Sequence, residues 1–418
     1  MAQLSDDCFA HGGALMPLDE ALAMLTERVG PVAGIKRLPL AETGGRLLAE
    51  DVTAEVDVPP HDNSAVDGYA LFADDLDPEN ETRLPVTGRV AAGHPLGRTA
   101  VRGEAIRIFT GAPMPVGPDT VMMQEDCRED GDHVVVMPGI RQGANRRDAG
   151  EDVRKGDIVL RRGRRLKPQD IGLAAAVGRT ELAVYEPIRV AVFSSGDEVR
   201  DPGRSLPEGA IYDSNRYILM SAIARLGCEV SDLGILPDDE ATIASALAKA
   251  AETHDLLLTS GGVSVGEEDH LRAAVEAGGN LHFWRLAIKP GRPVAMGQVG
   301  RTPIVGLPGN PGAVLVTFLL VARPILLRLA GMEDVSARRF QVRAGFDYKK
   351  KEGRREFVRA TLGVGEDGTP VVLKQGAGGA GILSSLVDAD GLVDLGADLT
   401  YLESGSNVDF LPFNEVLT

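Results

Sequence analysis

Three glycine-rich loops, each directly after a short apolar run, constrain the fold of this chain more than any other feature. The apolar runs begin at Val190, Leu256 and Ile304, and the loops that follow span residues 194–198, 259–269 and 306–312. Glycine lets backbone N–H groups approach an anion closely, and the N-terminus of a following helix adds a favourable dipole. These loops therefore predict a site for a phosphorylated small molecule.

Strands and helices are expected to alternate between residues 187 and 332. We expect strands near 188–193, 228–233, 255–259, 282–288 and 303–306, and helices near 214–226, 238–253, 269–277 and 311–329. This alternation is typical of a three-layer α/β domain, with a mostly parallel sheet and helices on both faces. Ligands bind such sheets at the carboxyl ends of the strands, where all three loops fall.

The rest of the chain predicts smaller, β-rich parts. Residues 59–148 contain short alternating apolar runs separated by Gly, Pro and Asp, which predicts an inserted β module. Residues 1–58 and 149–186 flank this module, and we expect them to pack together as one discontinuous N-terminal linker domain. Residues 333–418 return to short strands and predict a C-terminal β-barrel, with a sandwich as the alternative.

Composition and charge exclude several classes of protein. The 418 residues carry a formal net charge of −17, which argues against general binding to nucleic acid or to anionic membranes. The three cysteines are scattered and form no Cys-x-x-Cys, so we expect a reducing cytoplasm rather than disulfides or zinc. We expect no secretory signal, and a buried helix for the apolar run at 313–322.

The second glycine loop carries the strongest chemical signal. Its backbone N–H groups and serine hydroxyls can donate to an anion, and the residues concerned are Ser260, Gly261, Gly262, Ser264 and Gly266. Acids follow at 267–269, which suggests a divalent cation, although Asp269 can also cap the next helix. The loop matches neither the Walker nor the Rossmann pattern, which disfavours an ATPase or a dehydrogenase.

Cations gather between the last two loops. Arg285, Lys289 and Arg292 follow the single tryptophan, Trp284, in a segment without acids. A cation beside Pro-Gly has little freedom, which suits phosphate binding, and the alternative is a solvated turn.

The third loop opens a long apolar helix. Asn310 and Pro311 can simply cap this helix. The extra glycines favour an anion site, with Pro308 and Gly309 in contact with the ligand.

Residues 141–167 hold ten basic and four acidic residues, a local excess of positive charge. Residues 161–165 predict an exposed hairpin turn, whereas Arg147 and Asp152 are flanked by glycine and are better site candidates. Asp67 lies in a polar segment that, taken alone, indicates a structural turn. Histidine and cysteine form no nucleophile or metal pattern, so catalysis would rest on carboxylates, cations and a bound metal.

Together these segments resemble the molybdopterin molybdenumtransferase family, which includes the corresponding domain of gephyrin and of plant molybdenum-cofactor proteins. The matching stretches run in family order over nearly the whole chain; they are residues 63–70, 109–113, 145–153, 194–198, 211–215, 260–266, 288–293 and 307–311. Several are weak individually, but jointly they are very specific.

The resemblance implies a reaction and an assembly. Adenylylated molybdopterin would be bound, molybdate would be inserted at its dithiolene, and AMP would be released with the help of Mg²⁺. The chain would form an elongated homodimer of four-domain subunits, with each site built between two chains. Proteins that adenylylate molybdopterin and proteins that mature molybdoenzymes would be its partners.

The resemblance also assigns residues. The catalytic positions would be Asp67, Thr110, Asp152, Glu198, Asp238, Asp269 and Lys289, with Asp67 and Thr110 reaching the site from the partner chain and Glu198 and Asp269 holding the metal. Substrate contacts would come from Arg147, Ser260, Gly261, Gly262, Ser264, Gly266, Arg285, Pro308, Gly309, Asn310, and Ser384 or Ser385. One position departs from the family, since Arg285 stands where lysine is frequent, and arginine changes the donor geometry.

Two alternative functions remain at the level of sequence. A molybdopterin adenylyltransferase would share the α/β domain, but it would not need the β module or the C-terminal domain. A gephyrin-like scaffold without catalytic activity would not need the acidic site positions. ATP-dependent adenylylation, or tight binding of a protein partner without turnover, would identify these alternatives.

Overall fold

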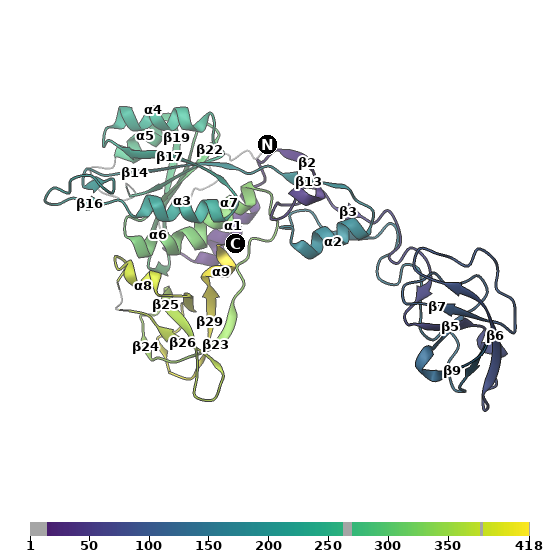
Figure 1. Cartoon of the computed structure of the whole chain (residues 1–418). Coiled ribbons are helices and arrows are strands. Elements are labelled where there is room, and N and C mark those ends of the chain that lie inside the picture. Colours follow the sequence, from purple (N-terminus) through teal and green to yellow (C-terminus); the bar gives the residue numbers. More distant parts are fainter. Residues whose placement is uncertain (1–14, 262–269, 377–378, 418) are drawn as a thin grey trace.

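A computed structural model of the chain describes residues 15–261, 270–376 and 379–417 (Figure 1). The molecule is elongated. An α/β part and the C-terminal β part lie together at one end, and the β module lies at the other. The linker elements lie between these two ends; they include β2 (Ile35–Pro39), β13 (Glu181–Tyr185), β3 (Val52–Thr53) and α2 (Pro168–Ala176).

Seven strands form the central sheet, in the order β1-β19-β21-β22-β18-β14-β17. Their bounds are β1 (Leu15–Met16), β19 (Gly279–Leu286), β21 (Pro293–Val299), β22 (Thr302–Leu307), β18 (Leu256–Ser260), β14 (Arg189–Ser195) and β17 (Glu229–Leu236). Strands β22, β18, β14 and β17 run parallel, whereas β21 is antiparallel to both of its neighbours. The prediction of a mostly parallel sheet is confirmed, although β21 is not among the strands expected from the sequence.

Helices cover both faces of this sheet (Figure 1). One face carries α1 (Leu18–Arg28), α3 (Asn215–Arg225) and the segment made of α6 (Pro311–Thr317), a π-helical turn (Phe318–Ala322) and α7 (Arg323–Leu329); the other carries α4 (Glu240–Ala251) and α5 (His270–Gly278). Successive strand side chains point to opposite faces, so Val190 and Val192 of β14 enter one core while Ala191 and Phe193 enter the other. The α/β part therefore has three layers, with the sheet between two layers of helices.

The segment Pro311–Leu329 is long and apolar enough to cross a membrane by length and composition, but 89% of its most apolar window is buried inside the protein. It packs in the core beneath the central sheet. The expectation of a buried helix is therefore confirmed.

The two segments that flank the β module pair with each other. Strand β2 (Ile35–Pro39) pairs with β13 (Glu181–Tyr185), and β3 (Val52–Thr53) pairs with β12 (Ile158–Leu160), beside α2 (Pro168–Ala176). Because these partners lie on either side of the module in sequence, the linker part is discontinuous. The residue limits of the four parts remain predictions.

The β module is a six-stranded sheet in the order β8-β5-β7-β6-β10-β9. Its strands are β5 (Gly68–Leu71), β6 (Thr82–Val90), β7 (Ala105–Ile108), β8 (Thr120–Met123), β9 (Cys127–Asp130) and β10 (His133–Val136), and β4 (Asn63–Ser64) pairs with β11 (Arg146–Arg147) beside them. Two small cores pack on this sheet.

Glu104 makes the stability of the β module dependent on pH. It is 5% exposed, and hydrogen bonds from Arg98, Thr87 and the Val101 backbone lower its pKa from 4.5 to about 2. This stabilisation is present above pH 4.5 and is lost as the pH falls towards 2. We expect the loss to be about 1–2 kcal/mol, because solvent screens the partly exposed Arg98.

Chemical unfolding at pH 7 and pH 3 would measure this effect. Glu104→Gln should lower stability at pH 7 and show a weaker pH dependence than the wild type. Glu79→Gln, at an exposed position of the same module, should match the wild type. An unchanged pH dependence in Glu104→Gln would contradict the assignment.

The C-terminal part is a closed five-stranded barrel. Its strands are β23 (Phe340–Ala344), β25 (Arg355–Val364), β26 (Pro370–Lys374), β27 (Gly391–Leu395) and β29 (Asn407–Pro412). The ring closes because β25 pairs with both β26 and β27. A short strand from the α/β part, β20 (Ile288–Lys289), pairs with β25 and joins the two parts.

The remaining elements are short. They are β15 (Val199–Arg200) and β16 (Ile211–Tyr212), which pair with each other, and β24 (Tyr348–Lys349) and β28 (Tyr401–Leu402), which also pair. The short helices are α8 (Ser384–Val387), α9 (Phe413–Val416) and three 3₁₀ turns at Leu40–Glu42, Ala73–Asp75 and Gln124–Asp126.

Candidate active site

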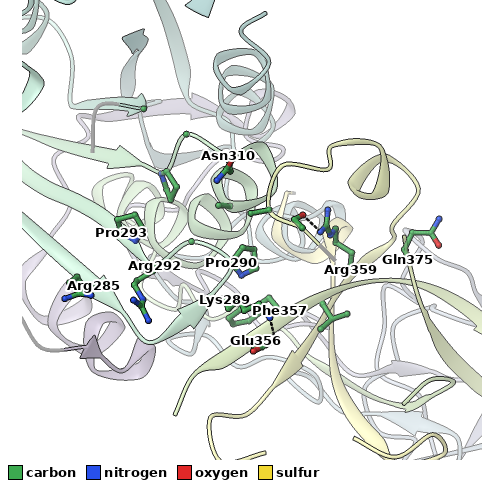
Figure 2. A pocket seen from close by; sticks show the side chains of 18 of the residues that line it. Arg285, Lys289, Pro290, Arg292, Pro293, Asn310, Glu356, Phe357, Arg359 and Gln375 are labelled. Atoms are coloured by element: carbon green, nitrogen blue, oxygen red, sulfur yellow. Dashed lines mark hydrogen bonds and ion pairs between the residues drawn. The ribbon is translucent and has the colours of Figure 1, made fainter. Parts of the chain in front are cut away.

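A cavity of about 1010 Å³ lies between the α/β part and the barrel (Figure 2). One wall comes from the carboxyl ends of the sheet strands, with Glu198 after β14, Gly261 after β18 and Gly309 after β22. The opposite wall comes from the barrel, with Tyr348 of β24 and Arg359 of β25. The position agrees with the rule that ligands bind where parallel strands end.

The lining of the cavity is cationic although the whole chain is acidic. Among the residues that the structure describes, five basic side chains line it, against two acidic ones; the basic residues are Arg285, Lys289, Arg292, Arg359 and Lys374. Arg285 and Arg292 come from the α/β part, and Arg359 lies across the cavity from them (Figure 2). Fixed cations on both walls suit a ligand with several negative charges.

Lys289 is held by a buried carboxylate of the barrel. Strands β20 and β25 pair so that Lys289 lies opposite Glu356, and the lysine Nζ is 3.0 Å from Glu356 Oε2 (Figure 2). The Tyr348 hydroxyl donates to the same oxygen at 3.0 Å, and burial together with Glu356 raises the pKa of Tyr348 to about 12. The glutamate side chain is 3% exposed while that of Lys289 is 52% exposed, so the ammonium group is anchored yet accessible.

Arg359 is fixed by the chain that follows β26. Its guanidinium donates to the carbonyl oxygens of Ile382 at 2.7 Å and Gly379 at 2.5 Å, and to Ser385 Oγ at 2.5 Å. Burial lowers the pKa of Arg359, and no ion pair to a carboxylate is found for it in residues 15–261, 270–376 and 379–417. A guanidinium oriented in this way, without a carboxylate partner, is suited to an anionic ligand.

The two glycine loops are tied together beneath the cavity. The Asn215 side-chain amide donates to Ser260 Oγ at 2.9 Å and to the Gly309 carbonyl at 2.6 Å, and Ser260 Oγ donates to the Pro308 carbonyl at 3.2 Å. Ser260 is 4% exposed. Its hydroxyl therefore serves to hold the loops in register, and it does not line the cavity.

The third loop combines an amide side chain on the cavity wall with a close backbone approach. Asn310 occupies the N-cap position of α6, but its side chain makes no capping hydrogen bond and lies in the cavity wall. The Gly312 N–H donates to the Ala380 carbonyl at 2.8 Å, and a Cβ on Gly312 would lie 2.7 Å from that oxygen. Gly312 is therefore required for packing against the barrel, and its N–H is not available to a ligand.

The cavity brings together seven of the residues predicted from sequence. These are Glu198, Gly261, Arg285, Lys289, Pro308, Gly309 and Asn310. Asp238 follows β17 at the same edge of the sheet but is not part of the lining. Gly262, Ser264, Gly266 and Asp269 lie outside the described residues. Ser384 is exposed and off the lining, whereas its neighbour Ser385 contacts Arg359.

The structure pairs two further predicted residues in the β module, away from the cavity. Asp67 Oδ1 accepts hydrogen bonds from the Thr110 N–H and from the Thr110 hydroxyl, both at 2.8 Å. These two bonds lower the pKa of Asp67. Arg147 and Asp152 are exposed. Asp67 directly precedes β5 and Thr110 follows β7, and both strands lie on the far side of the linker elements from the α/β part (Figure 1).

Sequence reasoning missed the barrel wall. No local motif marks the lining residues of this wall, which are Tyr348, Glu356, Arg359 and Lys374. The pairing of β20 with β25 brings this wall to Lys289. One signal was present, since Arg359 is a cation within an otherwise apolar strand run, Phe357-Val358-Arg359-Ala360.

Comparison with known proteins gives the family. The MoeA N-terminal region (domain I and II) matches residues 16–178, the probable molybdopterin binding domain matches 191–328, and the MoeA C-terminal region (domain IV) matches 341–413. The molybdopterin molybdenumtransferase of Haemophilus influenzae is 37% identical over 405 residues, which cover 96% of this chain and 100% of that protein. The chain belongs to the molybdopterin molybdenumtransferase family.

Further relatives agree with this membership. Molybdopterin molybdenumtransferase 2 of Mycobacterium tuberculosis is 36% identical over 89% of this chain and 93% of its own. The crystal structure of the molybdopterin biosynthesis MoeA protein of Pyrococcus horikoshii OT3 superposes with a TM-score of 0.81 at 31% identity, covering 96% of this chain and 100% of that one. The predicted resemblance, the fold class, and the assignment to an enzyme family of molybdenum insertion are confirmed.

Proposed function

We propose that this chain binds adenylylated molybdopterin in the cavity between the α/β part and the barrel, and releases AMP as molybdate is inserted. The observation that carries the proposal is the cationic lining, with five basic residues against two acidic ones in the described part of a chain of charge −17. Substrate and molybdate are both anions, so bringing them together requires fixed cations. Oriented charge stabilises the cleavage of a phosphoanhydride without a covalent intermediate. We place this activity in the cytoplasm.

The described residues fit a requirement for Mg²⁺. Glu198 is an exposed carboxylate on the cavity wall, whereas the other acid among the described lining residues, Glu356, is already bonded to Lys289 and Tyr348. Mg²⁺ binds through one or two carboxylates together with substrate phosphates, so Glu198 alone is a sufficient contribution from the described residues, and Asp269, the second predicted metal ligand, lies outside them. When bound, the ion would neutralise charge on the phosphates. Lys289 and Arg359 would orient the anionic groups.

The site would be completed by a second copy of the chain. Asp67 and Thr110 share hydrogen bonds in the β module, and this module lies away from the α/β part and the barrel in Figure 1, which supports a contribution from the partner's module. The lowered pKa keeps Asp67 ionised in the neutral range, as a carboxylate that orients donors around the substrate. Arg147 and Asp152 would lie at the edge of the same site.

Release of AMP from adenylylated molybdopterin tests the proposal. Purified protein should release AMP with Mg²⁺, and molybdate should stimulate the release strongly and yield the metal-loaded cofactor. Removal of Mg²⁺ with a chelator should abolish the release. Binding of the substrate without AMP release under any of these conditions would contradict the proposal.

Arg285 tests the departure from the family pattern. Arg285→Ala should raise the KM for molybdate ten- to a hundredfold, since a hydrogen bond to a charged group contributes about 1.5–3 kcal/mol. Arg285→Lys keeps the charge and should remain closer to the wild type. Arg301→Ala removes an exposed arginine outside the cavity and should leave KM unchanged. Equal KM values in Arg285→Ala and the wild type would remove Arg285 from the molybdate site.

A further inference from the structure

A second cavity, of about 390 Å³, lies where the linker part meets the α/β part. Its wall includes Arg46 and Arg165 from the linker part, and Arg225, Gly227 and Cys228 from the end of α3 and the turn into β17. It shares no lining residue with the larger cavity. A ligand here would contact both parts of the chain at once.

The positive charge of Arg165 has no carboxylate partner among the described residues. Its two terminal nitrogens donate to the carbonyl oxygens of Gly45 and Leu226, each at 3.0 Å. Its Nε is buried without a hydrogen-bond partner, and no carboxylate pairs with the guanidinium in the described part of the chain. Burial lowers the pKa of Arg165. Arg165 is half-buried, and a partly desolvated charge without a counter-charge is less stable than a paired one, so an anion here would stabilise it.

The surroundings of Arg165 add positive charge. Arg225 bonds only to a backbone carbonyl, that of Leu417, and neither it nor Arg46 pairs with a carboxylate among the described residues. Among the described residues, Arg323, which is 5% exposed, also donates only to carbonyls; burial and the nearby Arg165 lower its pKa to about 10, while Asp334 acts in the opposite direction. The single acid of the cavity wall, Glu186, is exposed.

We propose that this junction cavity binds a small oxyanion of the phosphate class, free or carried on a small organic group. Guanidinium groups present planar donor pairs that match the oxygens of phosphate, and three of them line this cavity. The volume exceeds that of phosphate alone, and Leu47, Tyr185 and Ile188 add apolar surface beside the arginines. A phosphate on a small organic group therefore fits both the charge and the size.

Binding would also stiffen the molecule. Gly45 and Arg165 belong to the segments that connect to the β module, whereas Arg225 and Cys228 belong to the α/β part. An anion held by both sides adds hydrogen bonds across the junction. It would stabilise one orientation of the linker part relative to the sheet.

Cys228 provides a local readout of binding. Its thiol lies in the cavity wall, and burial raises its pKa to about 12. Cys127, in the β module, is partly buried and serves as an internal control. Alkylation of each cysteine in the full-length protein would be followed by peptide mass spectrometry, at constant ionic strength, with inorganic phosphate in one arm and AMP in the other.

A bound anion should protect Cys228 selectively. At a ligand concentration of about ten times Kd, alkylation of Cys228 should slow about tenfold while that of Cys127 stays unchanged. Arg46→Gln should weaken the protection, and Lys289→Ala, in the larger cavity, should retain it. Protection by phosphate would identify the free ion as sufficient, and protection by AMP alone would indicate a requirement for the organic group.

Thermal unfolding gives a second, independent measurement. The protecting anion should raise the Tm of the wild type more than that of Arg46→Gln. Binding in the larger cavity contributes equally to both proteins, so the difference in Tm reports binding in the junction cavity. The proposal is overturned if neither anion protects Cys228, if Cys127 is protected equally, or if Arg46→Gln shows full protection and the same rise in Tm.

Discussion

A heterodimer of Asp67→Asn and Lys289→Ala chains should be active although each parent homodimer is not. Each substitution removes a charged group from the proposed site, and we expect either homodimer to lose activity by about two orders of magnitude or more. If each site combines the β module of one chain with the cavity of the other, both defects fall in one site of the heterodimer. The other site is then intact, and activity should return to about half that of the wild type.

The heterodimer can be isolated by placing a different affinity tag on each chain and purifying through both. A matched control combines Asp67→Asn with Thr110→Ala, because these residues share a hydrogen-bonded pair in one module. In that heterodimer each site retains one defect, so activity should stay low. A heterodimer of Asp67→Asn and Lys289→Ala no more active than its parents would contradict a site built between chains.

The part of the site that could be predicted from sequence lies in short, continuous segments of the chain. Gly261 and Gly309 follow strands that alternate with helices, and Lys289 follows Trp284 within a short motif. Strand periodicity and turn chemistry determine such features locally. They therefore place one wall of the cavity before any tertiary structure is known.

The other wall depends on pairing between distant strands. Glu356 meets Lys289 only because β20 leaves the α/β part and pairs with β25 of the barrel, some 67 residues later in the chain. Arg359 gains its orientation from carbonyls of the segment at 379–382. Neither relation has a local signature, because tertiary pairing, and not the neighbouring sequence, decides which side chains meet.

Strand β21 was missed for a related reason. Its sequence, Pro293-Val-Ala-Met-Gly-Gln-Val299, begins with proline and contains a central glycine, and both residues weaken a strand prediction. In the sheet, Gly297 lies where a Cβ would come within 2.1 Å of the Asn280 carbonyl, so the close approach of β19 requires glycine there. Gly297, which weakens the strand prediction, is therefore the residue that allows β21 to pair with β19.

The barrel is expected to be held closed by Asp394, and removal of this carboxylate should destabilise it strongly. The Asp394 side chain is 2% exposed and accepts bonds from Arg355 Nε at 2.6 Å, a second Arg355 nitrogen at 2.7 Å and Arg339 Nε at 2.9 Å. Asp394→Ala would leave two guanidinium groups without this partner. Breaking a buried ion pair costs about 3–5 kcal/mol, and we expect the lower end because Arg355 also contacts Asp19 of α1.

Hydrogen exchange of the β25 and β27 amides would measure this loss directly, because these strands form the closing pair of the barrel. A loss of about 3 kcal/mol should speed their exchange about a hundredfold if it proceeds through opening of the barrel. Asp388→Ala removes an exposed carboxylate of the same part and should leave exchange unchanged. Asp394→Ala is also expected to loosen the pairing of β25 with β20, since the Arg355 N–H donates to the Ala287 carbonyl at 2.9 Å. If the exchange rates in Asp394→Ala stay within a few-fold of those in the wild type, the two arginines are stabilised without the carboxylate, which would contradict the prediction.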